Sequence, residues 1–336
     1  MNTCKYIVTS LIVLLLMACC QPKQPDYKKK LNVAIDPYSV AFDRYEEVLF
    51  NLDTFDFQHA LMEIQPQYSV FLGGDLNNPE AVRYLKDFAT DPFSLVLYDR
   101  VKAAFPDLSQ VKPLVEEVFA RFHSYYPEVQ LPSKVFTCVT GVTADVPAIQ
   151  IFGDEMVVSL DWYLNDEEIY DAIGMPKYMA LRRTLLTLPK DVAKELFMNY
   201  VNQWRKQGQI VDEMVYCGLI DFFVEAMCPA MSDSVLLGYS TPQWQWAVDN
   251  EGPVWADLVG SRRLYDSSLD SYMMLFGDGP FTQAYSNEAP SRLGEFFGLN
   301  VIRSYVATHD DFDLKKLMQR KDYQIIFQDS GYKPKK

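Results

Sequence analysis

The chain has 336 residues, a formal net charge of −14, 49% hydrophobic residues and 14% aromatic residues. This apolar, aromatic composition is that of a packed globular protein and excludes a disordered chain. The acidic charge repels phosphate backbones, and no stripe of lysine and arginine interleaved with aromatics is present, so nucleic acid is excluded as a partner.

The N-terminus has the features of a lipoprotein signal peptide. Residues 7–17 are mostly apolar and follow a short, weakly basic head. Eleven helical residues span roughly 17 Å, about half of a bilayer core, which suits a signal peptide and not a transmembrane helix. Ala18 directly precedes Cys19, as lipoprotein signal peptidase requires. We therefore expect cleavage after residues 1–18 and a covalent lipid, such as palmitate, on Cys19. The alternative is an ordinary signal peptide that happens to contain Cys19.

Residues 19–30 are polar, contain two prolines and have no apolar periodicity, which predicts a flexible tether. Residues 31–133 are predicted to form a helical region. Apolar residues recur there at three- and four-residue spacings in four segments: Ala41–Asn51, Asn77–Ala89, Pro92–Ala104 and Leu108–Ser124.

Residues 134–336 are predicted to form a second region of α+β type. Its sheet, at 134–164, is expected to be small and antiparallel, because short runs rich in Val, Ile, Phe and Thr alternate with glycine turns. These runs are Lys134–Thr143, Ala148–Phe152 and Met156–Leu160. Helices return between 177 and 327, broken by loops at 229–242 and 277–290. The predicted fold class is α+β and mostly helical.

The remaining motifs give little chemistry. No GxSxG, P-loop or glycine-rich dinucleotide turn is present, and the 3 histidines are far apart without HxxxH spacing. Cys217 and Cys228 could form a disulfide in an oxidising compartment, although two buried free thiols are favoured. The residues alone therefore indicate an acidic, lipid-anchored helical domain with a small sheet.

Several short segments occur in the order found in a known family, and together they make the chain resemble the GldB gliding-motility lipoproteins of Bacteroidetes. The resemblance covers residues 121–336. The matching segments are 125–127 with 134–137, then 159–164, 175–178, 249–255, 264–265, 280–281, 290–294, 298–305 and 330–334.

This resemblance implies a protein of the gliding and type IX secretion machinery. Its acyl chains would hold it in the outer membrane, facing the periplasm. It would act by binding other gliding or secretion lipoproteins or envelope proteins. The expected binding surface is a cleft framed by Trp162, Tyr163, Trp204 and the segment 244–255.

The GldB family in turn resembles zinc-dependent peptidases (zincins) that have lost their metal site. In those enzymes a helix carrying HExxH follows a small sheet, and here that slot would fall on residues 194–198. Lys194 and Met198 would replace the two histidines, Glu195 would keep the position of the general base, and Cys217 would take the third-ligand position. A lysine ammonium cannot ligate zinc and a thioether is a poor zinc ligand. The resemblance therefore implies a zincin-like, non-catalytic domain without metal or cofactor.

Two other functions remain open on the sequence. One is a metal-independent peptidase or glycosidase in which carboxylates of Asp161, Glu195 and Glu251 converge. The other is a carbohydrate-binding surface lipoprotein that uses exposed aromatic side chains.

Overall fold

The computed structural model describes residues 26–143, 146–202 and 208–334. The chain divides into two compact units, Met1–Asn32 and Val33–Lys336. The predicted cleavage site at Ala18 and Cys19 and most of the predicted tether lie outside the described residues. Within the tether, Asp26–Lys29 forms one helical turn, α2. Among the described residues, no helix combines the length and the apolar character needed to span a membrane. All other elements belong to the second unit.

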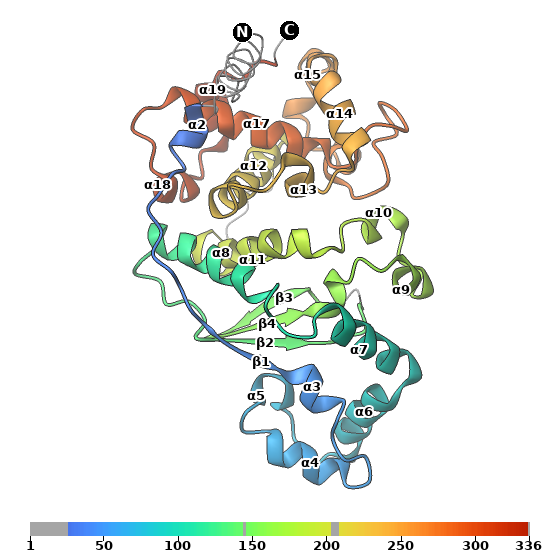
Figure 1. The fold of residues 1–336 in the computed structure, drawn as a ribbon. Coiled ribbons are helices and arrows are strands. Elements are labelled where there is room, and N and C mark those ends of the chain that lie inside the picture. The colour runs from blue at the N-terminus through green and yellow to red at the C-terminus, as the bar shows by residue number, and fades with distance from the viewer. Residues whose placement is uncertain (1–25, 144–145, 203–207, 335–336) are drawn as a thin grey trace, which may run out of the picture. The chain divides into compact units, whose positions relative to one another are not determined.

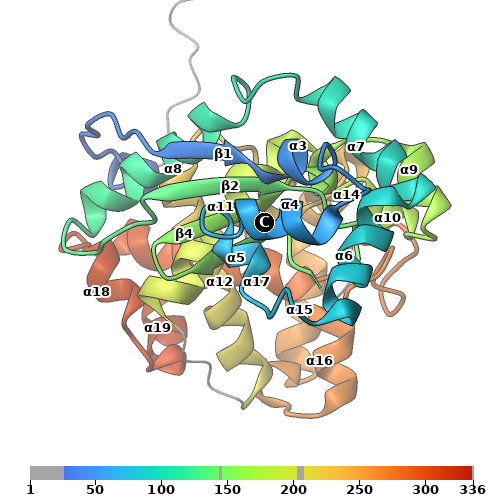
Figure 2. The same cartoon turned by 90° about the horizontal axis from the view of Figure 1, so that it is seen from below.

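A four-stranded mixed sheet lies between two layers of helices in the second unit (Figures 1 and 2). Its strands run in the order β1-β2-β4-β3, and their bounds are Ala41–Arg44, Lys134–Cys138, Ile149–Phe152 and Glu155–Ser159 for β1 to β4. Strand β2 pairs in parallel with both β1 and β4, and only β3 and β4 are antiparallel.

The prediction of an antiparallel sheet is therefore wrong for two of the three pairings. Runs of β-branched residues indicate strands but not their direction, and the glycine turn at Gly153 fixes only the hairpin of β3 and β4. The helix predicted over Ala41–Asn51 is also wrong in its first half. Residues 41–44 form β1 there, so the region 31–133 contributes an edge strand to the predicted sheet region.

Small helices cover one face of the sheet, below it in Figure 1 and in front of it in Figure 2. They are α3 (Tyr45–Leu49), α4 (Phe57–Ile64), α5 (Ser69–Leu72) and α6 (Pro79–Thr90). Phe136 and Val157 of the sheet share a core with buried residues of these helices, among them Tyr45 and Leu61. Helix α7 (Pro92–Ala104) follows. Helices α6 and α7 confirm the helices predicted at 77–89 and 92–104. Each begins with an N-capping side chain and a proline in its first turn.

The other face of the sheet packs against α8 (Lys112–Tyr125) and α11 (Leu188–Leu196), which also contact each other. Helix α11 continues into a π-helical turn, Phe197–Val201. The elements between β4 and α11 are short. They are a 3-10 turn at Leu160–Tyr163, α9 (Glu167–Ala172), α10 (Lys177–Ala180) and a 3-10 turn at Leu185–Thr187.

The last third of the unit is helical, as predicted, and is built around α12 and α17. Its elements are α12 (Ile210–Met227), α13 (Asp233–Leu237), α14 (Thr241–Asp249), α15 (Glu251–Gly260), a 3-10 turn (Arg263–Tyr265), α16 (Leu269–Phe276), α17 (Leu293–Thr308), α18 (Leu314–Met318) and α19 (Tyr323–Ser330). Residues 277–290 contain no helix, as predicted, whereas the loop predicted at 229–242 contains α13.

Helices α12 and α17 cross in backbone contact at two glycines. A Cβ atom on Gly218 would lie 2.2 Å from the carbonyl oxygen of Gly298, and one on Gly298 would lie 2.0 Å from that of Met214. Further along the crossing, Arg303 binds Glu225 through two hydrogen bonds of 2.9 Å. The two helices are thus held together by close backbone packing at the glycines and by a buried ion pair further along.

The three described cysteines are free thiols. Cys217 and Cys228 are eleven residues apart along α12 and its C-terminal cap, which separates them by about 16 Å. This is well beyond the reach of a disulfide. The favoured expectation of two free thiols is confirmed.

Candidate functional site

Helix α11 carries charged side chains toward the interior. Pro189 occupies its first turn, where the missing N–H leaves no hydrogen bond unmade, and Leu188 and Val192 are fully buried. Lys190 and Lys194 are one turn apart, and Lys190 is only 8% exposed. Lysines are rarely buried without a partner, so the neighbouring helices must supply negative charge.

The negative charge comes from α12 and from α11 itself. Lys194 Nζ lies 3.3 Å from Oδ1 of Asp221, whose side chain is 2% exposed. Burial raises the pKa of Asp221, and the nearby Lys194 opposes this rise. The second carboxylate oxygen of Asp221 is buried and has no hydrogen-bond partner among the described residues. On α11 itself, one turn before Lys194, Asp191 accepts a hydrogen bond of 3.0 Å from the hydroxyl of Tyr163.

Lys190 is the least compensated cation of this cluster. Burial and the positive charges of Lys194 and Arg292 together lower the pKa of Lys190 to about 7, against the opposing charges of Asp191 and Asp221. The ammonium form of Lys190 is thus disfavoured in the folded protein.

Stability should therefore depend on pH through Lys190. Its pKa is lower in the folded state than in the unfolded chain, so the cost of the buried charge is fully present below pH 7 and disappears as pH rises toward 10.5. We expect Lys190→Met to be more stable than the wild type by more than about 1 kcal/mol at pH 6. Urea unfolding of both proteins at pH 6 and pH 9 measures this. A stability difference that does not shrink at pH 9 would contradict the assignment.

The positions predicted as remnants of a metal site do not form one. Lys194 is paired with Asp221, and Glu195 bonds to the side chain of Asn199 at 2.9 Å and to the backbone of Ile151. The sulfur of Met198 accepts from the hydroxyl of Tyr216 at 3.8 Å, and this methionine is 41% exposed. These side chains thus have separate partners, and the π-helical turn that begins at Phe197 changes the helical register between Glu195 and Met198.

Cys217 does lie in the same region as Lys194. Its thiol donates to Glu213 at 3.5 Å, and burial raises its pKa well above the usual value while the charge of Lys194 opposes the rise. A protonated thiol is a poor metal ligand. Within the described residues, no group of three or more His, Cys, Asp or Glu side chains is placed to hold a metal ion.

The three carboxylates of the alternative hydrolase site have separate partners. Asp161 is buried and accepts from the backbone N–H groups of residues 140–142 at 2.8 to 3.1 Å. Burial raises the pKa of Asp161 to about 6, and these hydrogen bonds limit the rise. Glu251 bonds to Asn300 and Tyr332. Asp161 therefore holds a loop and Glu251 holds the C-terminal segment, and among the described residues neither shares a hydrogen bond with Glu195.

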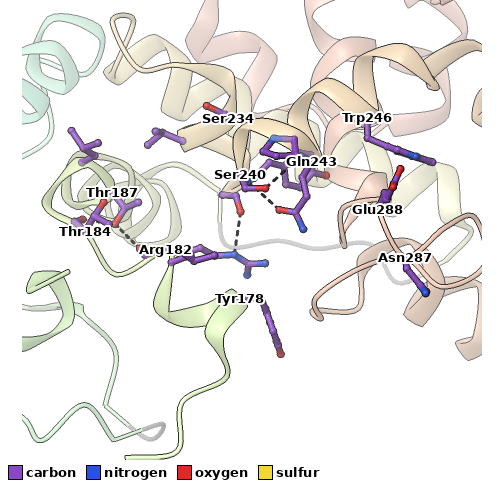
Figure 3. Close-up of a pocket in the computed structure, with 16 residues that line it drawn as sticks. Tyr178, Arg182, Thr184, Thr187, Ser234, Ser240, Gln243, Trp246, Asn287 and Glu288 are labelled. Carbon is purple, nitrogen blue, oxygen red and sulfur yellow. Dashed lines mark hydrogen bonds between the residues drawn. The ribbon is translucent and has the colours of Figure 1, made fainter. Parts of the chain in front are cut away.

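A pocket of about 620 Å³ lies beside the charged cluster (Figure 3). It is formed by residues 178–187, the segment joining α13 to α14, and residues 287–288. In the view of Figure 3, Tyr178 and Arg182 lie next to each other on one side of it, and Trp246 lies on another. Tyr239 also lines the pocket and donates to the backbone of Arg292 at 3.1 Å, which links the pocket to the cluster around α11.

The wall of this pocket is rigid and its rim is apolar. Arg182 donates to Gly238 at 3.2 Å and to Asp278 at 2.8 Å, and Gly238 has the positive φ of 68° that glycine favours. At the rim, Leu181 and Leu186 are 63% and 69% exposed. Large exposed leucines around a preformed pocket are typical of a surface that binds another protein.

The predicted aromatic frame is only partly present. Trp162 and Tyr163 are buried, and Trp162 packs beneath Arg183 with 4.0 Å between the guanidinium and the ring. Trp204 lies outside the described residues. Within 244–255, Trp255 packs on Phe297, so Trp246 is the tryptophan of that segment that lines the pocket.

Lys190, Asp191, Asp221 and Arg182 were not predicted as site residues. A signal for two of them exists in the sequence: Lys190 lies one turn before Lys194 among the apolar residues of one helix, and Asp221 interrupts the apolar run of α12. Arg182 follows no such pattern, because its role depends on the loop around Gly238.

Comparison with known proteins gives one family. The family model described as gliding motility protein GldB matches residues 24–334. No curated protein and no solved structure matches the chain.

Proposed function

The chain belongs to the GldB family of gliding motility lipoproteins, and from this premise we propose that it is a non-catalytic component that binds partners of the gliding and type IX secretion machinery. The observation that carries the non-catalytic part is the ion pair of Lys194 and Asp221 at 3.3 Å. It supports the proposal because Lys194, the residue that the resemblance to zinc-dependent peptidases would align with a metal-binding histidine, is a cation that already has an acidic partner.

The partner surface in this proposal is the pocket of Figure 3 with its rim. Its arginine is already bound to protein groups, so the pocket offers a fixed shape more than a free reactive group. Leu181 and Leu186 supply the apolar contact area that a partner would cover.

The non-catalytic role predicts that Glu195→Gln leaves gliding and secretion unchanged, because this carboxylate has no metal-bound water to activate. The control is Leu196→Arg on the same helix. Leu196 is fully buried, so the arginine should lower protein abundance and abolish function by unfolding. Both variants are compared in cells at matched protein level. If Glu195→Gln is abundant and membrane-bound but inactive, a carboxylate mechanism replaces this proposal.

We also propose that the lipid on Cys19 holds the protein in the outer membrane, facing the periplasm. Cys19→Ala removes the sulfur that forms the thioether, so we expect an unprocessed chain without lipid. Metabolic labelling with a clickable palmitate measures this, with Cys138→Ala as the matched control that keeps the label. Undiminished label on Cys19→Ala would show that the anchor lies elsewhere.

A further inference from the structure

A second pocket, of about 650 Å³, lies between the sheet and the small helices α3, α5 and α6. Its volume is within the range of ligand-binding pockets. Most of its wall is apolar, and the side chains that form it come from both layers. They include Leu49, Val70, Phe71, Leu85, Phe88 and Val157.

Two polar backbone groups of this wall are already used by the protein. Thr140 and Gly141 line the pocket, and their backbone N–H groups donate to Asp161 at 2.9 and 2.8 Å. The hydroxyl of Tyr45 is buried with no hydrogen-bond partner among the described residues. A peptide or a sugar carries many donors and acceptors, and this mostly apolar wall would replace only a few of their hydrogen bonds to water. A hydrocarbon chain makes no hydrogen bonds with water, so its transfer from water into the pocket is favourable.

The mouth of the pocket combines apolar and acidic side chains. Tyr84 and Phe152, which line it, are 74% and 49% exposed. Asp87 and Asp91 also line it, and Asp91 accepts from the backbone of Ser94 at 2.8 Å. Two carboxylates repel the carboxylate of a free fatty acid and attract a positively charged amine.

We propose that this pocket takes one acyl chain of a membrane phospholipid whose head group carries an amine. The chain enters between the sheet and α6, and the ammonium lies at Asp87 and Asp91. A lipoprotein is held at a membrane surface, where such lipids are within reach. The site is separate from the pocket of Figure 3, so this inference does not depend on the proposed function.

Photocrosslinking of the full acylated protein in cells tests the proposal. The probe is a palmitate analogue with a diazirine and a terminal alkyne, which the cells incorporate into phospholipids. After irradiation, the protein is purified and its peptides are analysed by mass spectrometry. We expect adducts on peptides from α6 and from residues 149–157, with the mass of an amine-bearing phospholipid.

Two variants with the same change on neighbouring helices locate the site. Leu85→Trp on α6 fills the pocket and should reduce the adducts at least about tenfold. Leu95→Trp on α7, a residue that is 40% exposed and does not line the pocket, should leave them unchanged. If Leu85→Trp lowers abundance, Val70→Trp on α5 fills the same space. Asp87→Asn should shift the adducts from amine-bearing toward acidic lipids.

Three results would overturn the proposal. The first is a well-expressed wild type without adducts in these peptides. The second is equal labelling of the two tryptophan variants. The third is an adduct that contains only the protein's own acylated Cys19 peptide, because the occupant would then be the anchor and not a phospholipid.

Discussion

Gly298→Ala is expected to destabilise the protein by about 3 kcal/mol or more. The new methyl group would lie 2.0 Å from the backbone carbonyl oxygen of Met214, and a backbone atom cannot rotate away as a side chain can. Helices α12 and α17 would have to separate at their closest point, which also disturbs the packing of α19 on both. Alanine favours a helix over glycine by about 1 kcal/mol, which is too little to offset this.

Chemical denaturation of the purified protein measures this effect, and Gly260→Ala is the matched control. Gly260 is the last residue of α15, and a Cβ there would have nothing within 4 Å. The control should be neutral or slightly stabilising. Equal stability of the two alanine variants would mean that the helices do not cross in backbone contact.

The helices of this fold could be predicted from the sequence where local signals coincide with the apolar period. Asn78 with Pro79, and Asp91 with Pro92, begin α6 and α7 at the predicted places because capping is a local interaction. Strand β1 could not be predicted, because four residues carry little pattern and its pairing partner β2 begins ninety residues later. The parallel pairing of β2 with β4 likewise depends on the layers around the sheet.

The sequence singled out Lys194 and Cys217 of the charged cluster but not their partner Asp221. Helix α11 and the thiol of Cys217 lie near each other, and Lys194 lies close to both Cys217 and Asp221. Asp221 was missed because its role depends on its partner Lys194, which lies on another helix, and the sequence does not show that the two helices are in contact. The π-helical turn at Phe197 was also missed, since a sequence window assumes a uniform helical period.

Asp221→Leu should destabilise the protein by about 3 kcal/mol, because it leaves the Lys194 ammonium without its partner and removes one of the charges that oppose the fall in the pKa of Lys190. In this variant Lys194 has no acidic group at 3.3 Å. The charge of Lys194 already lowers the pKa of Lys190 in the wild type. The side chain of Lys194 is 31% exposed, so water compensates part of the loss and keeps it below that of a fully buried pair.

The double variant Lys194→Met with Asp221→Leu separates charge from packing. Replacing both partners by apolar groups removes the unpaired cation, so the double variant should recover most of the stability that Asp221→Leu loses. Asp99→Leu is the control for the same substitution in an exposed ion pair, since Asp99 is 71% exposed and lies 3.1 Å from Lys102, and it should cost less than about 1 kcal/mol. Urea unfolding of the wild type, of Lys194→Met and Asp221→Leu singly, and of the double variant completes the cycle. If the double variant is no more stable than Asp221→Leu, the aspartate matters for its shape and hydrogen bonds, and not as the counter-charge of Lys194.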